Sequence, residues 1–295
     1  MKTRGTQQTT LKIGPFQLSP VEAGRFLLDG GAMFGVVPKT MWSKKISADS
    51  DNRIKMAMRS LLIRSDKTGK IYLIDTGSGH KFNEKMKAIY GLDYEHSELL
   101  RSLDSLGVSP SDITDIIFSH LHFDHCGGTT EWQNNELREV FPNATYHVNR
   151  LHWETATNPN QREKASFFSE NLDPIATSGR LHLTEDSVEF EPGLSAIPVH
   201  GHTLGQQLPV IRADGKTVVF AADLIPTFAH VPLPWVMGYD MNPVQTLEEK
   251  ESFLKRAADN HWYLFLEHDA EHEVITVNFT DGKYQMHESH LLHEI

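Results

Sequence analysis

The chain has 295 residues, 39% of them hydrophobic, which is enough for one large domain with a sizeable core. Its formal net charge of −11 argues against nucleic acid or an anionic membrane as a partner, because both bind basic surfaces. One cysteine, no membrane-spanning apolar stretch and no secretory signal at the N-terminus lead us to expect a cytoplasmic protein.

The first half of the chain begins with a mixed N-terminal arm, residues 1–50, which contains a glycine-rich apolar segment at 27–39. Apolar runs on either side of a turn at 66–69 then predict a β-hairpin. Helical spacing and short β-branched runs predict two helices and two strands after it. In chain order these elements cover residues 56–79, 83–92, 96–107, 112–119 and 144–150.

The second half begins with a polar segment, residues 151–180, which we interpret as a helical insertion. Five short strand candidates separated by Gly, Asp and Pro follow between 180 and 224. Residues 242–260 have the spacing of a helix, and 262–269 form a last buried strand. Strands alternate with helices, and no linker or repeat divides the chain, so we predict a single α/β domain over residues 1–295.

Three histidines and one aspartate lie within six positions in the sequence FSHLHFDHCGG, residues 118–128, just after a predicted strand. In extended geometry His120 and His122 point to the same side, and Asp124 and His125 follow in a tight loop. A hydrophobic core would not tolerate this cluster. Imidazole and carboxylate groups together suit zinc, iron, manganese or cobalt.

Similar polar residues stand at four other predicted strand ends: Asp75, His202, Asp223 and His268. Loops converge at strand ends in sheet folds, so these side chains are candidates for the same site. Simpler interpretations also exist, because Asp75 can stabilise a turn and Asp223 can form an Asx turn. His200 lies in the same turn as His202, but nothing in the sequence assigns it a direct role.

The pattern HxHxDH at 120–125, with the four other motifs in order, resembles the metallo-β-lactamase superfamily over residues 56–270. The resemblance implies an αββα sandwich of two mixed β-sheets flanked by helices. The segments GGAMFG, HLHFDHCGG, DLIPT and EHD are most similar to the branch of quorum-quenching lactonases and organophosphate hydrolases.

The resemblance also implies two divalent metal ions, with zinc as the first expectation and iron, manganese or cobalt as alternatives. One ion would be held by His120, His122 and His202, the second by Asp124, His125 and His268, and Asp223 would bridge both. A hydroxide between the ions would be the nucleophile. Asp124 and Asp223 are therefore the expected catalytic residues, with Asp124 as proton shuttle. Asp75 would orient a ligand histidine.

The implied function is hydrolysis of a lactone or related ester, including substrates like N-acyl homoserine lactones. The alternatives are phosphotriester hydrolysis, a mononuclear iron dioxygenase and an inert binding protein. One departure from the family pattern bears on this choice: Pro226 stands where related lactonases carry a tyrosine, and Tyr239 is the candidate replacement. The expected partner is a small molecule, and a homodimer is left open.

Apolar residues predict a substrate pocket above the metal ions. The candidates for its wall are Met33, Phe34, Phe228 and Tyr239, with Trp42, Trp235 and Met237 as further possibilities. Met33 and Phe34 could equally be a plug in the core. Two other features are given structural interpretations. Cys126 is expected to be a small packing residue, and three C-terminal histidines are expected at solvated helix positions, namely His287, His290 and His293.

Overall fold

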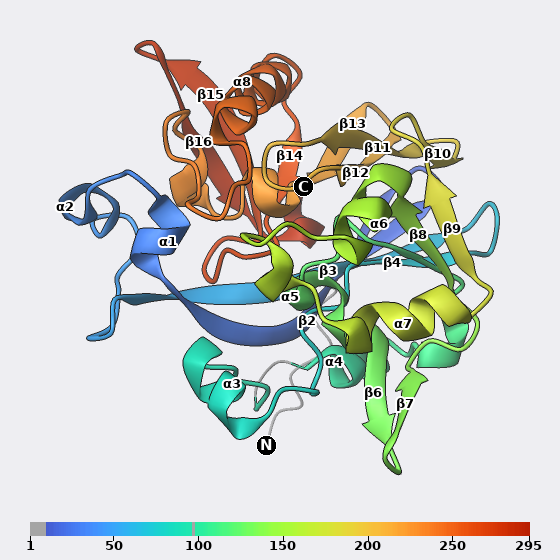
Figure 1. Cartoon of the computed structure of the whole chain (residues 1–295). Helices are drawn as coiled ribbons and strands as arrows, with labels where there is room; N and C mark the ends of the chain where they lie inside the picture. The colour runs from blue at the N-terminus through green and yellow to red at the C-terminus, as the bar shows by residue number, and fades with distance from the viewer. Residues whose placement is uncertain (1–9, 96–97) are drawn as a thin grey trace, which may run out of the picture.

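Two mixed seven-stranded β-sheets lie at the centre of the computed structural model, which describes residues 10–95 and 98–295 (Figure 1). The first sheet has the order β1 (Leu11–Ile13), β2 (Phe16–Asp29), β3 (Arg53–Ser65), β4 (Ile71–Ile74), β5 (Asp115–Ile117), β8 (Thr145–Asn149) and β9 (Leu181–Thr184). The second has the order β10 (Glu189–Glu191), β11 (Leu194–Val199), β12 (Gln206–Ala213), β13 (Lys216–Phe220), β14 (Tyr263–Phe265), β15 (Val274–Thr280) and β16 (Lys283–His290). A separate hairpin joins β6 (Thr130–Gln133) to β7 (Glu136–Glu139).

Helices cover the outer faces of both sheets. Helices α3 (Glu84–Tyr90) and α4 (Leu99–Ser105) pack against β2, whereas α8 (Pro243–Asp259) packs against β15. The remaining α-helices are α1 (Gly30–Phe34), α2 (Lys39–Trp42), α5 (Phe123–Cys126), α6 (Arg150–Thr157) and α7 (Ser169–Thr177). Short 3-10 helices are η1 (Pro110–Asp112), η2 (Gly127–Thr129), η3 (Lys164–Ser166), η4 (Ala222–Leu224), η5 (Phe228–His230) and η6 (Leu292–Glu294). This arrangement is the αββα sandwich that the sequence predicts. In the described part of the chain, no helix is both long and apolar enough to cross a membrane.

The two faces of the first sheet bury different hydrophobic clusters, because successive strand residues point to opposite sides. Tyr72 and Ile117 join the cluster between the sheets, which includes Phe220 of the second sheet. Their neighbours Leu73 and Ile116 belong to the outer cluster beneath the helices. All five side chains are fully buried. Burial on both faces fixes the register of these strands, and with it the positions of the residues that follow them.

The predicted hairpin is confirmed, since β3 and β4 pair antiparallel with Leu61 opposite Ile74. The predicted helix over 242–260 is confirmed as α8, which begins at Pro243. The predicted helix at 96–107 appears as α4, and residues 96–97 lie outside the described residues. Within 151–180 the structure has α7 and most of α6.

Residues 16–29 of the N-terminal arm form β2, which pairs with β3 along its whole length. Residues 1–9 of the arm lie outside the described residues.

The expectation of helix positions is wrong for His287 and His290, which lie on strand β16, whereas His293 lies in the short 3-10 helix η6. Asp281 and Gly282 have φ values of 53° and 72°, which suit the tight turn between β15 and β16 and favour a hairpin there. Asn134 and Asn135, with φ values of 52° and 63°, turn the β6–β7 hairpin in the same way. These two short hairpins were not predicted.

Candidate metal centre

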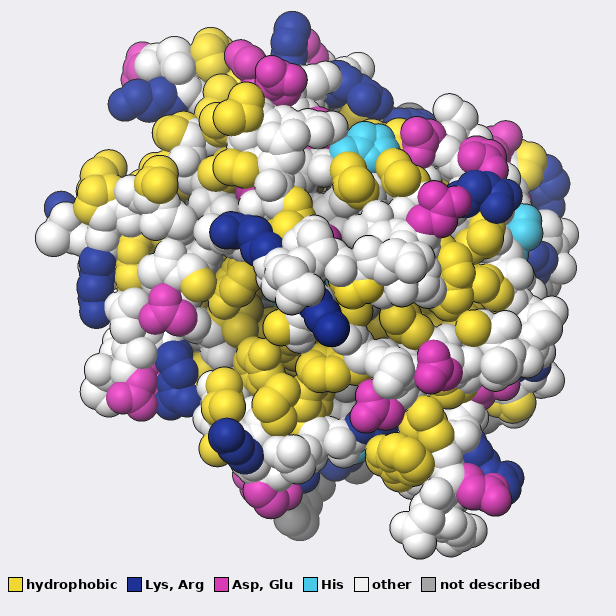
Figure 2. Space-filling view, viewed as in Figure 1, with side chains coloured by type: hydrophobic (Ala, Val, Ile, Leu, Met, Phe, Trp, Pro, Cys, Tyr) yellow, Lys and Arg dark blue, Asp and Glu magenta, His cyan; other side chains and the backbone are white. Residues whose placement is uncertain are grey.

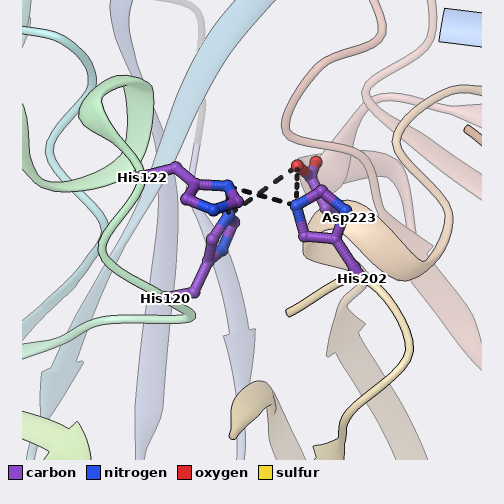
Figure 3. Close-up of side chains that lie close together, drawn as sticks. All are labelled: His120, His122, His202 and Asp223. Atoms are coloured by element: carbon purple, nitrogen blue, oxygen red, sulfur yellow. Dashed lines mark hydrogen bonds and ion pairs between the residues drawn. The ribbon is translucent and has the colours of Figure 1, made fainter. Parts of the chain in front are cut away.

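Five chain segments that follow strands meet at one edge of the sandwich. Asp75 follows β4, the 120–125 segment follows β5, His202 lies between β11 and β12, Asp223 follows β13, and His268 follows β14. Figure 3 shows four of these side chains, His120, His122, His202 and Asp223, turned toward one another. The parallel pairs β4–β5 and β13–β14 bring their carboxyl ends to the same edge, which is why residues so distant in sequence converge.

The first group of donor atoms contains three imidazoles and one carboxylate. His122 Nδ1 lies 3.0 Å from His120 Nε2 and 3.2 Å from His202 Nε2. Asp223 Oδ2 lies 3.1 Å from His202 Nε2. All four donor atoms lie within 4.8 Å of one another, and all four residues are buried. This group can surround one ion.

The second group contains two imidazoles and one carboxylate on the other side of Asp223. His125 Nε2 lies 3.1 Å from His268 Nε2. Asp124 Oδ2 lies 3.7 Å from His268 Nε2 and 3.8 Å from His125 Nε2. Asp223 Oδ1 lies 3.1 Å from His268 Nε2, and Asp223 Oδ2 lies 3.6 Å from His125 Nε2, so Asp223 contacts the second group as well as the first. Asp223 is therefore placed where a carboxylate could be shared by two ions.

The outward nitrogen of each of the five histidines has a polar partner. Three of the partners are carboxylates: His122 Nε2 lies 3.2 Å from Glu163 Oε1, His125 Nδ1 lies 3.0 Å from Asp75 Oδ2, and His202 Nδ1 lies 2.9 Å from Asp240 Oδ1. The partner of His120 Nδ1 is the hydroxyl oxygen of Ser119 at 3.1 Å. The partner of His268 Nδ1 is the carbonyl oxygen of Ala57 at 2.8 Å. An outward nitrogen that donates its proton leaves the inward nitrogen with a free lone pair. This is the arrangement of metal-ligating histidines.

Two further observations show that these residues fit a divalent metal. Neutral imidazole nitrogens about 3 Å apart repel each other through their lone pairs unless a proton or a cation lies between them. In addition, Asp223 Oδ1 is buried and has no well-aligned hydrogen-bond donor among the described residues, and its near polar neighbour is the imidazole nitrogen Nε2 of His268 at 3.1 Å. A buried carboxylate oxygen without a donor is costly, and a bound cation removes that cost.

Burial and charge also set the protonation of these imidazoles. Burial and the neighbouring imidazole of His125 hold the pKa of His120 well below its usual range. Burial opposes a charge on His202 and His268 too, but Asp223 outweighs it and raises their pKa values to about 10 and about 9. Metal ions would have to displace these protons, so metal binding should weaken as pH falls.

The backbone is strained at two positions beside the site. Asp75 and Ala222 have φ values of 54° and 42°, a left-handed conformation that non-glycine residues rarely adopt. The turn at Ala222 precedes Asp223. The turn at Asp75 lets both of its oxygens reach Ser119, with Oδ1 accepting from the backbone N–H at 2.7 Å and Oδ2 from the hydroxyl. The strain thus accompanies the placement of the Asp223 carboxylate and of the carboxylate behind His125.

A cavity of about 350 Å³ opens above the two groups of donors. Hydrophobic side chains surround a hollow in the middle of the face shown in Figure 2. Its apolar and aromatic lining consists of Leu28, Met33, Met56, Tyr90, Phe123, Ala165, Met237, Tyr239 and Met241. The expected wall residues Met33 and Tyr239 line this cavity, and so does Met237.

Phe34 and Phe228 are corrections to the expected pocket wall. Phe34 is fully buried between Trp42 and His230, whose rings stack on it at 5.1 Å and 4.6 Å. Phe228 packs against the hydrophobic core and the ring of His272. Phe34 belongs to the core, and Phe228 is a half-buried side chain that packs against the core, so neither lines the cavity.

Tyr239 lines the same cavity as Asp124 and His122. Burial raises the pKa of its phenol to about 12, so the hydroxyl keeps its proton at neutral pH and can donate a hydrogen bond. Pro226, at the family's tyrosine position, has no such group. Tyr90 is a second phenol in the cavity, and burial also raises its pKa. Tyr90 was not predicted.

Several residues that support the site were not predicted either. Glu163 and Asp240 lie in loops far from any motif and have no sequence signal that marks them as partners of histidines. Glu267 is fully buried beside His125, with its Oε2 3.0 Å from Nδ1, and its place next to His268 was the one available signal.

Two other predictions concern residues near the site. His200 accepts a hydrogen bond from the N–H of Gly205 at 3.0 Å, which is a structural role in the turn. The Cys126 thiol is buried and donates to the carbonyl of Leu121 at 3.3 Å. Burial raises its pKa to about 12, so it packs as predicted and is no nucleophile.

Comparisons with known proteins identify related chains. A family model described as the metallo-beta-lactamase superfamily matches residues 59–268. The N-acyl homoserine lactonase AttM of Rhizobium radiobacter is 26% identical over 164 residues, which are 54% of this chain and 59% of that protein. The aligned part therefore spans less than two thirds of that relative.

Solved structures are similar over nearly the whole chain. A probable metal-dependent hydrolase from Staphylococcus aureus has a TM-score of 0.84 and 31% identity, covering 95% of this chain and 100% of that one. AidC, a dizinc quorum-quenching lactonase, has a TM-score of 0.79 and 22% identity, covering 95% and 97%, and this likeness shows the fold alone. With the family model matching well over half of its length, the chain belongs to the metallo-β-lactamase superfamily.

Proposed function

We propose that this protein is a metal-dependent hydrolase that opens a lactone or cleaves a related carboxylic ester. The proposal includes two divalent metal ions, with zinc as the first expectation for their identity. The observation that carries the proposal is the pair of buried donor groups that both contact Asp223 at the floor of an apolar cavity. The family, and the lactonases among its similar proteins, support the same reaction class.

The proposed ligands of one ion are His120, His122 and His202, and those of the other are Asp124, His125 and His268. Asp223 contacts both groups and would be shared by the two ions. When bound, such a metal pair supplies a water of lowered pKa and a positive charge that polarises a carbonyl group. The proposal therefore needs no serine or cysteine nucleophile.

The side chains of the cavity carry the remaining steps. Asp124 is 8% exposed and lines the cavity, so it can take a proton from the attacking water and deliver it to the leaving oxygen. Tyr239 keeps its proton and can donate a hydrogen bond to the substrate carbonyl. The apolar walls exclude water from the acyl part of the substrate, which favours apolar lactones and esters over charged or highly polar ones at that position.

A panel of substrates tests the proposal. The purified protein is loaded with zinc and assayed on an acyl homoserine lactone, an aryl ester and an aryl phosphotriester. We expect the first two to be hydrolysed, and Asp223→Asn to abolish their hydrolysis. The matched control is Asp173→Asn, which makes the same chemical change at an exposed position of α7. A fully metal-loaded protein that hydrolyses only the phosphotriester, or nothing, contradicts the proposed substrate class.

A further inference from the structure

One basic side chain stands on the rim of the cavity. Among the described residues that line it, Arg162 alone is a lysine or arginine. It is exposed, whereas the proposed metal ligands on the same cavity are buried, so Arg162 marks the outer end and the metal site the inner end. Apolar side chains such as Leu28, Met56 and Phe123 lie along the same walls.

Arg162 also lacks an acidic partner among the residues that the structure describes, although the chain has 39 acidic and 28 basic residues. Within the described part of the chain, six arginines form ion pairs with carboxylates, and Arg162 is not among them: Arg25, Arg53, Arg59, Arg138, Arg150 and Arg180. The adjacent carboxylate, Glu163, is turned inward, where it contacts His122 and accepts a hydrogen bond from Thr203. The charge of Arg162 is therefore not neutralised by its own neighbourhood.

The guanidinium is nevertheless held in place. Its Nη2 donates to the carbonyl oxygen of Gly238, which also lines the cavity. Its backbone N–H donates to Asn160 Oδ1 at 2.9 Å, and the Asn160 amide lies 3.7 Å from Met241 Sδ. These contacts fasten the segment around Arg162 to the segment that carries Tyr239. They use one of the five guanidinium N–H donors and leave the others for a ligand.

We propose that Arg162 binds a carboxylate on the substrate, at the end remote from the bond that is cleaved. This inference rests on the proposed function and narrows its substrate class to lactones or esters with an apolar middle and an anionic end. The planar fork of arginine matches a carboxylate in a bidentate contact, and little side-chain entropy is lost because the group is already held. A substrate would have to reach from the zinc ions at the inner end of the cavity to Arg162 at the outer end, so the two sites together would select substrates by the length of their apolar chain.

Binding of two acids tests the inference without any need for turnover. Hexanoate and adipate differ only in a terminal methyl group versus a second carboxylate, and isothermal titration calorimetry measures their affinities for the zinc-loaded protein. We expect adipate to bind about tenfold tighter, since the new contact is charge-assisted but partly exposed to solvent. The advantage should shrink as the salt concentration rises.

Three variants show whether Arg162 binds the carboxylate of the ligand or only holds the rim of the cavity in place. Arg162→Met should remove the advantage of adipate and leave hexanoate binding unchanged, whereas Arg162→Lys should keep part of it. Lys164→Met is the matched control, because it removes a positive charge two residues away that does not line the cavity, and it should keep the advantage. Equal binding of both acids, equal weakening of both by Arg162→Met, or the same loss in Lys164→Met would overturn the inference.

Kinetics then show whether the inference and the proposed function stand or fall together. The p-nitrophenyl ester of hexanoate and the mono-p-nitrophenyl ester of adipate give matched substrates, and we expect the adipate ester to have the lower KM. If neither ester nor any lactone is hydrolysed but adipate still binds tighter through Arg162, the proposed function fails and the carboxylate site stands. If both esters are hydrolysed with the same KM, the carboxylate site fails and the proposed function stands.

Discussion

The orientation of His202 depends on a single carboxylate, which makes Asp240→Asn a sharp perturbation. Asp240 is 2% exposed, and its Oδ1 lies 2.9 Å from His202 Nδ1. An asparagine of the same shape can still accept the hydrogen bond, but it cannot supply the negative charge that makes the imidazole a stronger ligand.

The expected magnitude follows from the burial of this pair. Loss of the carboxylate partner of a ligand histidine weakens metal affinity by about 10- to 100-fold, or about 1.4–2.7 kcal/mol. Solvent does not screen the interaction, since both side chains are buried. The zinc affinity of the group that contains His202 should fall, whereas the zinc affinity of the group that contains His268 should stay unchanged.

Competition of the protein with a zinc chelator measures both affinities, because two sites of different strength appear as two steps. Asp75→Asn provides the contrast, since Asp75 lies behind His125 and its removal should weaken the other step. Asp259→Asn controls for a lost acidic charge, because Asp259 forms only an exposed pair with Lys255. The reasoning is refuted if Asp240→Asn leaves both steps unchanged or shifts both equally.

Three further predictions concern single residues. Asp223→Ala should lower zinc binding to fewer than two ions per chain by elemental analysis and remove all hydrolysis; two ions retained would contradict the shared carboxylate. Tyr239→Phe should lower kcat/KM for lactones about tenfold at unchanged zinc content, and an unchanged value would exclude its phenol from the reaction. Burial lowers the pKa of Lys250 from 10.5 to about 7, so between these values the unfolded chain holds a proton that the folded chain lacks. The free energy of unfolding should therefore rise with pH by up to about 1.4 kcal/mol per pH unit above about pH 7 because of Lys250. In urea unfolding, Lys250→Met should show a shallower rise of this free energy with pH than the unchanged protein. Parallel pH profiles of the two proteins would refute this.

The convergence of the metal-site residues could be predicted because each follows a short strand, and most of these strands are buried. A buried strand such as β5 has a strong local signature in Ile116, Ile117 and Phe118, and the polar residues after it stand out. The order of the motifs along the chain resembles that of a known family, and this resemblance predicted contacts between segments that are distant in sequence. No local pattern could have predicted those contacts. The parallel pairing of β13 with β14, which places Asp223 near His268, is a long-range contact that became predictable only through this resemblance.

The supporting residues could not be predicted in the same way. Glu163 and Asp240 lie in loops, and they reach His122 and His202 only because the chain folds back over the cavity. Phe34 shows the converse difficulty, since an aromatic residue in a glycine-flanked loop has the same sequence signature in a pocket wall and in a core. Phe34 lies in the core because it stacks on Trp42 and His230. These are tertiary contacts, which the local sequence does not reveal.

The central claim is that two cations share Asp223 at the floor of the cavity. Anomalous diffraction from crystals grown with zinc, recorded on both sides of the zinc absorption edge, tests it most directly. Our account predicts two anomalous peaks per chain, one beside His120, His122 and His202 and one beside His125 and His268, with Asp223 between them. A single peak, or peaks away from these side chains, would contradict it.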